Sequence, residues 1–257
     1  MINTLLIDLD GTLVDSKQAS KLLYDNIAKY CLNDIKLGKN LRVLFKKYCD
    51  DGFLTIPHSE YLKNIEPGWD AIFLTDFSSK TPKIIEIYEK VSEYKYSKIK
   101  SILSELGIKE EVIIKSIISF IDENWIKYYT PFNETYKFLE ECCKFKKYIL
   151  TNGLTNIQLK KIKYCKLYKA FDDIFISEMF GIGKPYVEYF ERILHKTNID
   201  KRDTIMIGNG KSDIIGAENI GIKSIYLKEN NDFEEIELKA TAVVRSLNEI
   251  PKLLELI

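Results

Sequence analysis

The sequence is poor in several residue types on which large classes of protein depend. Only 2 of its 257 residues are histidine, which argues against a His-rich metal cage or a histidine-based catalytic triad. The 5 cysteines are odd in number and form no C-x-x-C motif, so we expect reduced thiols rather than a disulfide framework or a zinc site. No apolar run approaches the roughly 20 residues that cross a bilayer, and the N-terminus lacks the basic lead of a secretion signal. These absences predict a cytoplasmic protein that has no membrane partner.

The sequence also lacks an excess of either charge. Its 38 Lys and Arg residues balance 38 Asp and Glu residues, so no overall electric field favours nucleic acid. Proline and glycine are few, at 6 and 12 residues, and 46% of the chain is hydrophobic, which is ordinary for a globular protein. A chain of 257 residues is long enough for one large domain or for a core with a smaller second unit.

Short runs of β-forming residues end abruptly in polar or glycine residues at five places. Continuous apolar strands of this kind suit a parallel sheet that is buried on both faces. Helical patterns lie between them, and this alternation predicts βαβ units and a doubly wound, Rossmann-like α/β fold. The expected strands are Thr4–Asp8, Tyr148–Gly153, Asp173–Glu178, Thr204–Gly210 and Lys223–Leu227, with a weaker sixth at Thr241–Val244. The expected helices are Asn156–Lys166, Val187–Lys196, Asp213–Asn219 and Leu247–Leu256.

The interval between the first and second expected strands is different in character. From Ser16 to about Thr130 the sequence carries long amphipathic helical patterns and few strand signals. It could be a helical elaboration of the core or a separate module inserted after the first strand. Over a hundred helical residues cannot be a simple crossover, so the module is favoured. We therefore expect a Rossmann-like core from residues 1–15 and 131–257, and an all-helical domain from residues 16–130.

Polar side chains follow the expected strands at the edge where an open parallel sheet binds its ligands. Each has an ordinary interpretation on its own, as a turn residue, a helix cap or a solvated lysine. Their arrival in order at successive strand ends favours one shared site instead. The candidates are Asp8, Asp10, Thr151, Asn152, Lys184, Asn209 and Asp213.

These side chains suit a site that binds a phosphate beside a metal ion. Two like charges about 4 Å apart repel by about 4 kcal/mol at an effective dielectric constant of 20. Asp8, Asp10 and Asp213 facing a phosphate therefore need a cation, and oxygen ligands with phosphate point to Mg²⁺. Lys184 and Thr151 would bind the remaining phosphoryl oxygens, the lysine as a point charge and the hydroxyl as a directed donor.

The turn at residues 208–213 could instead be a nucleotide-binding loop. Its G-K-S sequence at residues 210–212 matches the end of G-x-x-x-x-G-K-[ST], but that motif needs a glycine where Ile205 stands. The G-x-G-x-x-G pattern fails as well, because Asp213 occupies the place of its third glycine. Both nucleotide loops are excluded, and the metal and phosphate interpretation is kept.

Four stretches together resemble the motifs of the haloacid dehalogenase (HAD) superfamily. They occur in the family's order, cover both ends of the core and span about half of the chain. DLDGTLVDS is the most specific of them, and the 16–130 insertion sits where this family places its helical cap domain. The stretches are DLDGTLVDS at 8–16, LTNG at 150–153, GIGKP at 181–185 and GNGKSDIIGAENIGI at 208–222.

The resemblance implies a phosphomonoester hydrolase that works through an aspartyl-phosphate intermediate. Asp8 would attack phosphorus, and Asp10 would protonate the leaving alkoxide and later take a proton from water. Mg²⁺ would be held by Asp8, the backbone carbonyl of Asp10, and the fourth motif with Asp213 and Asn209. Dehalogenating members lack the second aspartate, so the presence of Asp10 favours phosphate esters. The implied phosphate-binding residues are Thr151, Asn152 and Lys184.

Asn209 departs from the family pattern, which usually has an Mg²⁺-binding aspartate at this place. An asparagine oxygen can still coordinate a metal, but the site loses one negative charge. We therefore expect weaker Mg²⁺ binding, with Asp213 compensating, rather than loss of activity. Residues 150–162 and 171–185 resemble the branch that contains pyrimidine 5′-nucleotidases and N-acylneuraminate-9-phosphatases. The expected substrate is a small phosphorylated metabolite, such as a nucleoside monophosphate or a sugar phosphate. A phosphomutase and a non-catalytic relative with weakened metal binding are the alternatives, and the sequence fixes neither the substrate nor the oligomeric state.

Overall fold

The computed structural model describes residues 2–49, 59–228 and 240–257. By internal contacts the chain forms two compact units. The sheet unit comprises Met1–Asp15, Thr130–Asn152 and Cys165–Ile257. The helical unit comprises Ser16–Tyr129 and Gly153–Tyr164. The segment after the second strand thus groups with the helical unit, and the predicted limits of a catalytic core and a cap domain stay a prediction.

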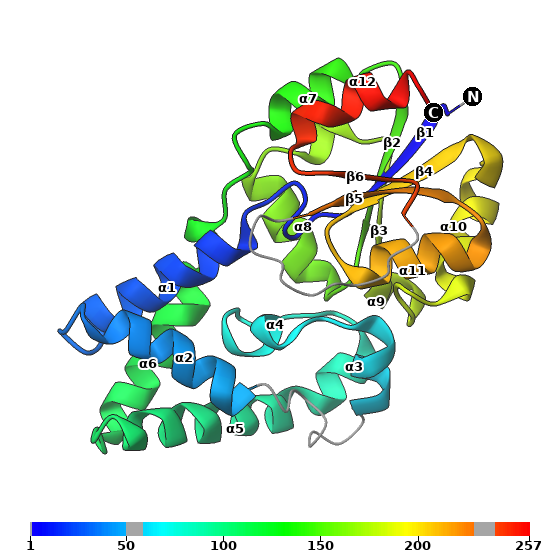
Figure 1. Ribbon diagram of the computed structural model, residues 1–257. Helices are drawn as coiled ribbons and strands as arrows, with labels where there is room; N and C mark the ends of the chain where they lie inside the picture. Colours follow the sequence, from blue (N-terminus) through cyan, green and yellow to red (C-terminus); the bar gives the residue numbers. More distant parts are fainter. Residues whose placement is uncertain (1, 50–58, 229–239) are drawn as a thin grey trace. The chain divides into compact units, whose positions relative to one another are not determined.

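Among the described residues of the sheet unit, six parallel strands form its centre, which confirms the predicted doubly wound α/β fold (Figure 1). Their order is β3-β2-β1-β4-β5-β6, and every neighbouring pair is parallel. All residues of β1 and β4 are buried, which explains why these strands read as continuous apolar runs. The strands are β1 (Thr4–Ile7), β2 (Lys146–Thr151), β3 (Asp173–Ile176), β4 (Thr204–Gly208), β5 (Lys223–Leu227) and β6 (Ala242–Val244).

The strand ends explain where the polar candidates fall. β1 ends at Ile7 and β4 ends at Gly208, so Asp8 and Asn209 come directly after neighbouring strands. The backbone N–H of Asp8 still donates to the carbonyl of Ile207 at 2.9 Å, which continues the pairing by one bond. Asp8 is therefore held rigidly, although it lies outside the strand.

Helices cover both faces of the sheet. α10 and α11 lie on one face, and α7 and α12 lie together on the other (Figure 1), as right-handed crossovers require. The expected helix at Leu247–Leu256 is divided into a 3₁₀ turn and α12, with Pro251 in the first turn of α12, where its missing N–H is tolerated. The helices are α7 (Thr135–Glu141), α9 (Ser177–Phe180), α10 (Val187–Thr197), α11 (Lys211–Ile220) and α12 (Ile250–Leu254), with 3₁₀ turns η2 (Tyr168–Ala170), η3 (Lys201–Asp203) and η4 (Leu247–Glu249).

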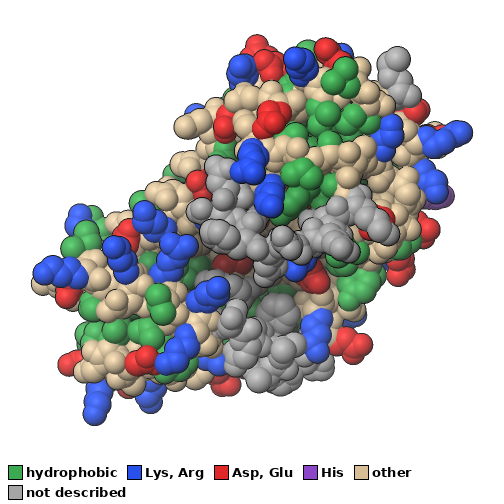
Figure 2. Space-filling view, viewed as in Figure 1, with side chains coloured by type: hydrophobic (Ala, Val, Ile, Leu, Met, Phe, Trp, Pro, Cys, Tyr) green, Lys and Arg blue, Asp and Glu red, His purple; other side chains and the backbone are tan. Residues whose placement is uncertain are grey.

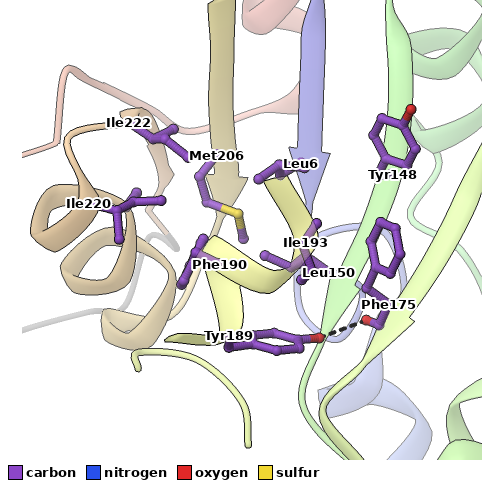
Figure 3. Close-up of a cluster of buried hydrophobic side chains, with 11 residues drawn as sticks. Leu6, Tyr148, Leu150, Phe175, Tyr189, Phe190, Ile193, Met206, Ile220 and Ile222 are labelled. Carbon is purple, nitrogen blue, oxygen red and sulfur yellow. Dashed lines mark hydrogen bonds between the residues drawn. The ribbon is translucent and has the colours of Figure 1, made fainter. Parts of the chain in front are cut away.

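An apolar cluster joins the strands to α10 and α11. Tyr189 and Phe190 of α10 are fully buried in it, against side chains from four strands (Figure 3). The Tyr189 hydroxyl donates to the carbonyl of Phe175 at 3.0 Å, which satisfies a polar group that would otherwise be costly to bury. This contact fixes the start of α10, and hence the end of the loop that carries Lys184. The cluster comprises Leu6, Tyr148, Leu150, Phe175, Tyr189, Phe190, Ile193, Met206, Ala217, Ile220 and Ile222.

In the described part of the helical unit every regular element is a helix. α1 packs against α2 and α6, and α2 packs against α5. Over residues 2–49, 59–228 and 240–257, no helix combines the length and apolarity needed to cross a membrane. Lys and Arg side chains are interspersed with Asp and Glu on the face shown in Figure 2. The elements are α1 (Ser16–Tyr30), α2 (Leu37–Cys49), α3 (Ser59–Ile65), α4 (Trp69–Phe73), α5 (Pro82–Glu105), α6 (Glu111–Asn124), η1 (Trp125–Tyr128) and α8 (Thr155–Tyr164).

Polar contacts tie this unit together internally. Lys95 of α5 is buried, and its Nζ lies 2.8 Å from Asp122 Oδ1 and 2.9 Å from the carbonyl of Thr75. Burial lowers the pKa of Lys95, and the Asp122 carboxylate opposes that shift. On α8, Lys160 forms an ion pair with Asp76, and α8 also packs against η1, so its contacts agree with its place in the helical unit.

Replacing Gly216 with alanine should destabilise the protein, although alanine normally favours a helix by about 1 kcal/mol over glycine. A Cβ at this position in α11 would lie 2.3 Å from Cε2 of Phe190, which is fully buried and cannot withdraw freely. We expect Gly216→Ala to lower the free energy of unfolding by about 1–3 kcal/mol. The measurement is urea unfolding, with Asn219→Ala on the exposed face of the same helix as control. A gain of stability in both variants would show that the helix and the cluster are not packed this closely.

Candidate active site

Lys184 connects two aspartates that are far apart in the sequence. Its Nζ lies 2.6 Å from Asp8 Oδ1 and 2.7 Å from Asp213 Oδ1, and all three side chains are buried. A third oxygen, the carbonyl of Leu150 in β2, lies 2.8 Å away. Asp8 Oδ1 and the carbonyl of Leu150 accept hydrogen bonds from the ammonium, whereas Asp213 Oδ1 pairs with it by charge and accepts no hydrogen bond from the described residues.

The charges at this point do not cancel, because one lysine faces two carboxylates. The pKa of Asp8 is raised to about 7 in total: burial raises it most, Lys184 lowers it, and Asp213 and, more weakly, Asp10 raise it. Burial favours the neutral form of Lys184, but attraction to Asp213 and Asp8 outweighs it and raises the pKa of Lys184 above its usual value. With both carboxylates ionised the group has a net negative charge, so a further cation would stabilise it.

Thr12 is a site residue that the sequence interpretation missed. Its Oγ1 lies 3.1 Å from Asp8 Oδ2 and 3.2 Å from Asn209 Oδ1, and the residue is fully buried. Because a hydroxyl has a single proton, these two oxygens share it. The sequence held a signal for this role, since Thr12 directly follows the turn glycine in the first motif.

Gly11 allows the first motif to turn beside Asn209. Its φ of 81° lies in the left-handed region, which favours glycine. A Cβ at Gly11 would lie 2.2 Å from Nδ2 of Asn209, so a side chain there would displace the amide. The turn therefore serves two purposes, since it returns Thr12 toward Asp8 and leaves room for residue 209.

Asp213 is both a helix-capping residue and a member of the charged group. Its Oδ2 accepts a hydrogen bond from the backbone N–H of Gly210 at 2.9 Å, in the first turn of α11. Its other oxygen, Oδ1, faces Lys184 at 2.7 Å. The capping bond thus fixes the orientation of the carboxylate toward the lysine.

The other sequence candidates lie at the same edge of the sheet. Thr151 is buried at the end of β2, and its Oγ1 lies 3.4 Å from the carbonyl of Asn152. The Asn152 amide faces the backbone of Lys184: Nδ2 donates to the carbonyl and Oδ1 accepts from the N–H, each at 2.8 Å. Asp10 is half-buried in the turn after β1 and influences the pKa of Asp8.

The donor atoms fit a hard divalent cation such as Mg²⁺. Asp8 Oδ2 and Asn209 Oδ1 both lie within hydrogen-bonding distance of one hydroxyl, so two oxygen donors converge beside a net negative charge. Carboxylate and amide oxygens are ligands that such a cation accepts. Among the residues that the structure describes, no group of three or more His, Cys, Asp or Glu side chains is arranged to hold a metal. A bound ion would therefore also depend on the amide of Asn209 and on backbone oxygen.

Comparison with known proteins agrees with this geometry. The family model described as haloacid dehalogenase-like hydrolase matches residues 2–221. The chain belongs to this family. A glyceraldehyde 3-phosphate phosphatase from Pyrococcus furiosus is 33% identical over 111 residues, which cover 42% of the chain and 46% of that relative. The pyrimidine 5′-nucleotidase YjjG from Escherichia coli is 32% identical over 108 residues, which cover 41% and 48%. The chain thus matches about half the length of these relatives.

A solved structure confirms that the fold is that of a HAD hydrolase. The HAD-hydrolase YfnB from Bacillus subtilis, which was solved bound to magnesium, superimposes with a TM-score of 0.62. The alignment covers 98% of each chain at 22% sequence identity. At that identity the likeness shows the shared fold.

Removing the lysine should lower the free energy of unfolding, because two buried aspartates would lose the cation that they share. Lys184→Met keeps most of the side-chain volume but leaves Asp8 and Asp213 without their shared cation. We expect the free energy of unfolding at neutral pH to fall by about 3–5 kcal/mol in metal-free buffer. In the control Lys196→Met, an exposed lysine 3.9 Å from Asp173 is lost, and the change should stay within about 1 kcal/mol. Equal losses in urea unfolding of the two variants would contradict the description of a buried charged group.

Proposed function

We propose that this HAD-family protein is a phosphomonoester hydrolase that acts on a small phosphorylated metabolite. The observation that carries the proposal is the buried group of Asp8, Lys184 and Asp213 at the carboxyl edge of the sheet. In this group a buried carboxylate lies 2.6 Å from a cation, in the region where this class of fold binds its ligands, and this supports Asp8 as the nucleophile.

Asp8 is the proposed nucleophile, and both of its oxygens are already oriented. Lys184 contacts Oδ1, and the Thr12 hydroxyl contacts Oδ2. In the first step an Asp8 oxygen bonds to phosphorus, and the bond from phosphorus to the substrate oxygen breaks. Asp10 gives its proton to that leaving oxygen, so the product departs as an alcohol.

The second step returns Asp8 to its original state. Asp10, now ionised, takes a proton from a water molecule as the water oxygen bonds to phosphorus. The bond between phosphorus and Asp8 breaks, and inorganic phosphate is released. Lys184 reduces the charge of the phosphoryl group during both steps, and Thr151 is proposed to donate to another of its oxygens.

Mg²⁺ is the proposed cofactor. The residues that would hold it are Asp8, the backbone carbonyl of Asp10, Asn209 and Asp213. When bound, it would cancel negative charge that Lys184 alone leaves on the site.

The substrate class follows from the relatives and not from the site. A nucleoside monophosphate or a sugar phosphate is favoured, because the similar proteins include pyrimidine 5′-nucleotidases and glyceraldehyde 3-phosphate phosphatases. We propose that the helical unit acts as the substrate-selecting cap. A cytoplasmic location stays a prediction.

A screen of phosphorylated metabolites with Mg²⁺ should find one that releases inorganic phosphate. Asp8→Asn should then reduce release to the level of an enzyme-free sample, since an amide cannot form the acyl phosphate. The control Asp200→Asn changes an exposed carboxylate paired with Arg202 and should leave the rate unchanged. Undiminished release by Asp8→Asn would reject Asp8 as nucleophile and point to a contaminating phosphatase. Isomerisation of a sugar phosphate without net release would indicate a phosphomutase instead.

Asn209→Asp should strengthen Mg²⁺ binding. The substitution keeps the size of the side chain and adds a negative charge, and a unit charge about 4 Å away is worth about 4 kcal/mol at a dielectric constant of 20 before desolvation is counted. We expect the dissociation constant for Mg²⁺ to fall roughly tenfold or more, which corresponds to about 1.4 kcal/mol. Titration calorimetry with Mg²⁺ measures this without turnover, and Asn248→Asp on the exposed surface is the control. An unchanged dissociation constant would argue that residue 209 is not a ligand.

A further inference from the structure

We propose that Asn152 is a positioning residue that holds Lys184, rather than a ligand of the phosphate. The inference rests on the proposed function, because the lysine that it positions is the proposed phosphate-binding group. It departs from the expectation that Asn152 itself contacts the phosphate.

The contact between the two residues uses both ends of the Asn152 amide. Nδ2 donates to the carbonyl oxygen of Lys184, and the N–H of Lys184 donates to Oδ1, each at 2.8 Å. The two bonds hold both backbone polar groups of Lys184, so neither its N–H nor its carbonyl can rotate alone. Asparagine suits this position, since aspartate offers no proton to the carbonyl.

Lys184 is consequently held at both ends by the tip of β2. Its backbone is bound by Asn152, and its ammonium lies 2.8 Å from the carbonyl of Leu150, two residues earlier in the chain. This arrangement fixes how far Nζ of Lys184 lies from the end of β2, and therefore where Nζ contacts Asp8 and Asp213. A shift of about 1 Å in such a charged group can cost about a hundredfold in rate.

The loop before Lys184 is shaped to allow this approach. A Cβ at Gly183 would lie 2.4 Å from Oδ1 of Asn152 and 2.7 Å from Cβ of Ser177, which is fully buried. Only glycine lets the loop lie this close to the amide. Gly183→Ala should therefore disturb the same contact from the other side.

Amide hydrogen exchange at Lys184 tests the contact without any need for activity. In Asn152→Ala the Lys184 N–H loses its acceptor, and we expect it to exchange at least tenfold faster than in the wild type by NMR. Asn152→Asp keeps an acceptor oxygen, so the Lys184 N–H should exchange at close to the wild-type rate in this variant. The same rate is expected in the control Asn248→Ala. Exchange at Lys184 that is the same in Asn152→Ala and wild type would overturn the proposal.

A double-mutant cycle then separates positioning from direct binding. We expect Asn152→Ala to lower kcat/KM about a hundredfold in the wild type, but less than threefold when Lys184 is already methionine. Equal fold-losses in the two backgrounds would mean that Asn152 acts on the substrate directly, and would overturn the proposal. If the wild type releases no phosphate from any metabolite, the proposed hydrolase function fails, whereas hydrogen exchange still decides whether Asn152 holds Lys184. Hydrogen exchange also decides it if the methionine variant does not fold.

Discussion

The buried lysine between two aspartates is the interaction on which the site depends. Lys184 joins the end of β1, through Asp8, to the first turn of α11, through Asp213, and to β2 through the carbonyl of Leu150. Three separate segments of the chain are thus fixed by one ammonium group. The ammonium compensates part of the charge of the two carboxylates, so the buried group can form. Since the two carboxylates together exceed the charge of the ammonium, the group retains an attraction for a second cation.

The fold could be predicted from the sequence because local and global signals agree. β1 and β4 are buried throughout, mostly apolar and followed directly by polar residues, so these strands and the order of the candidate side chains could be read from the sequence. The division of the last helix follows from Pro251, which the apolar periodicity alone does not weigh. The grouping of α8 with the helical unit reflects long-range contacts that no local pattern reveals, among them its packing against η1 and the ion pair of Lys160 with Asp76.

The sequence predicted the charged candidates and three neutral ones, Thr151, Asn152 and Asn209, but it did not predict Thr12 or the hydrogen-bond partners of the neutral side chains. Asp8, Lys184 and Asp213 are conspicuous because buried charges must find partners. Thr12 and Asn152 act through hydrogen bonds whose partners are set by the turn at Gly11 and by the backbone of Lys184, and sequence spacing does not show those partners. Asp213 is both a helix-capping residue and a member of the charged group, because one carboxylate oxygen accepts from the N–H of Gly210 and the other faces Lys184.

The three oxygens around Lys184 have a consequence for any anion that would bind the lysine. An ammonium that already has three oxygens within 2.8 Å gains little net energy when it exchanges one of them for an oxygen of the anion. The native oxygens are ready to take their places again as soon as the anion leaves. Such a lysine would hold an anion weakly and release it easily.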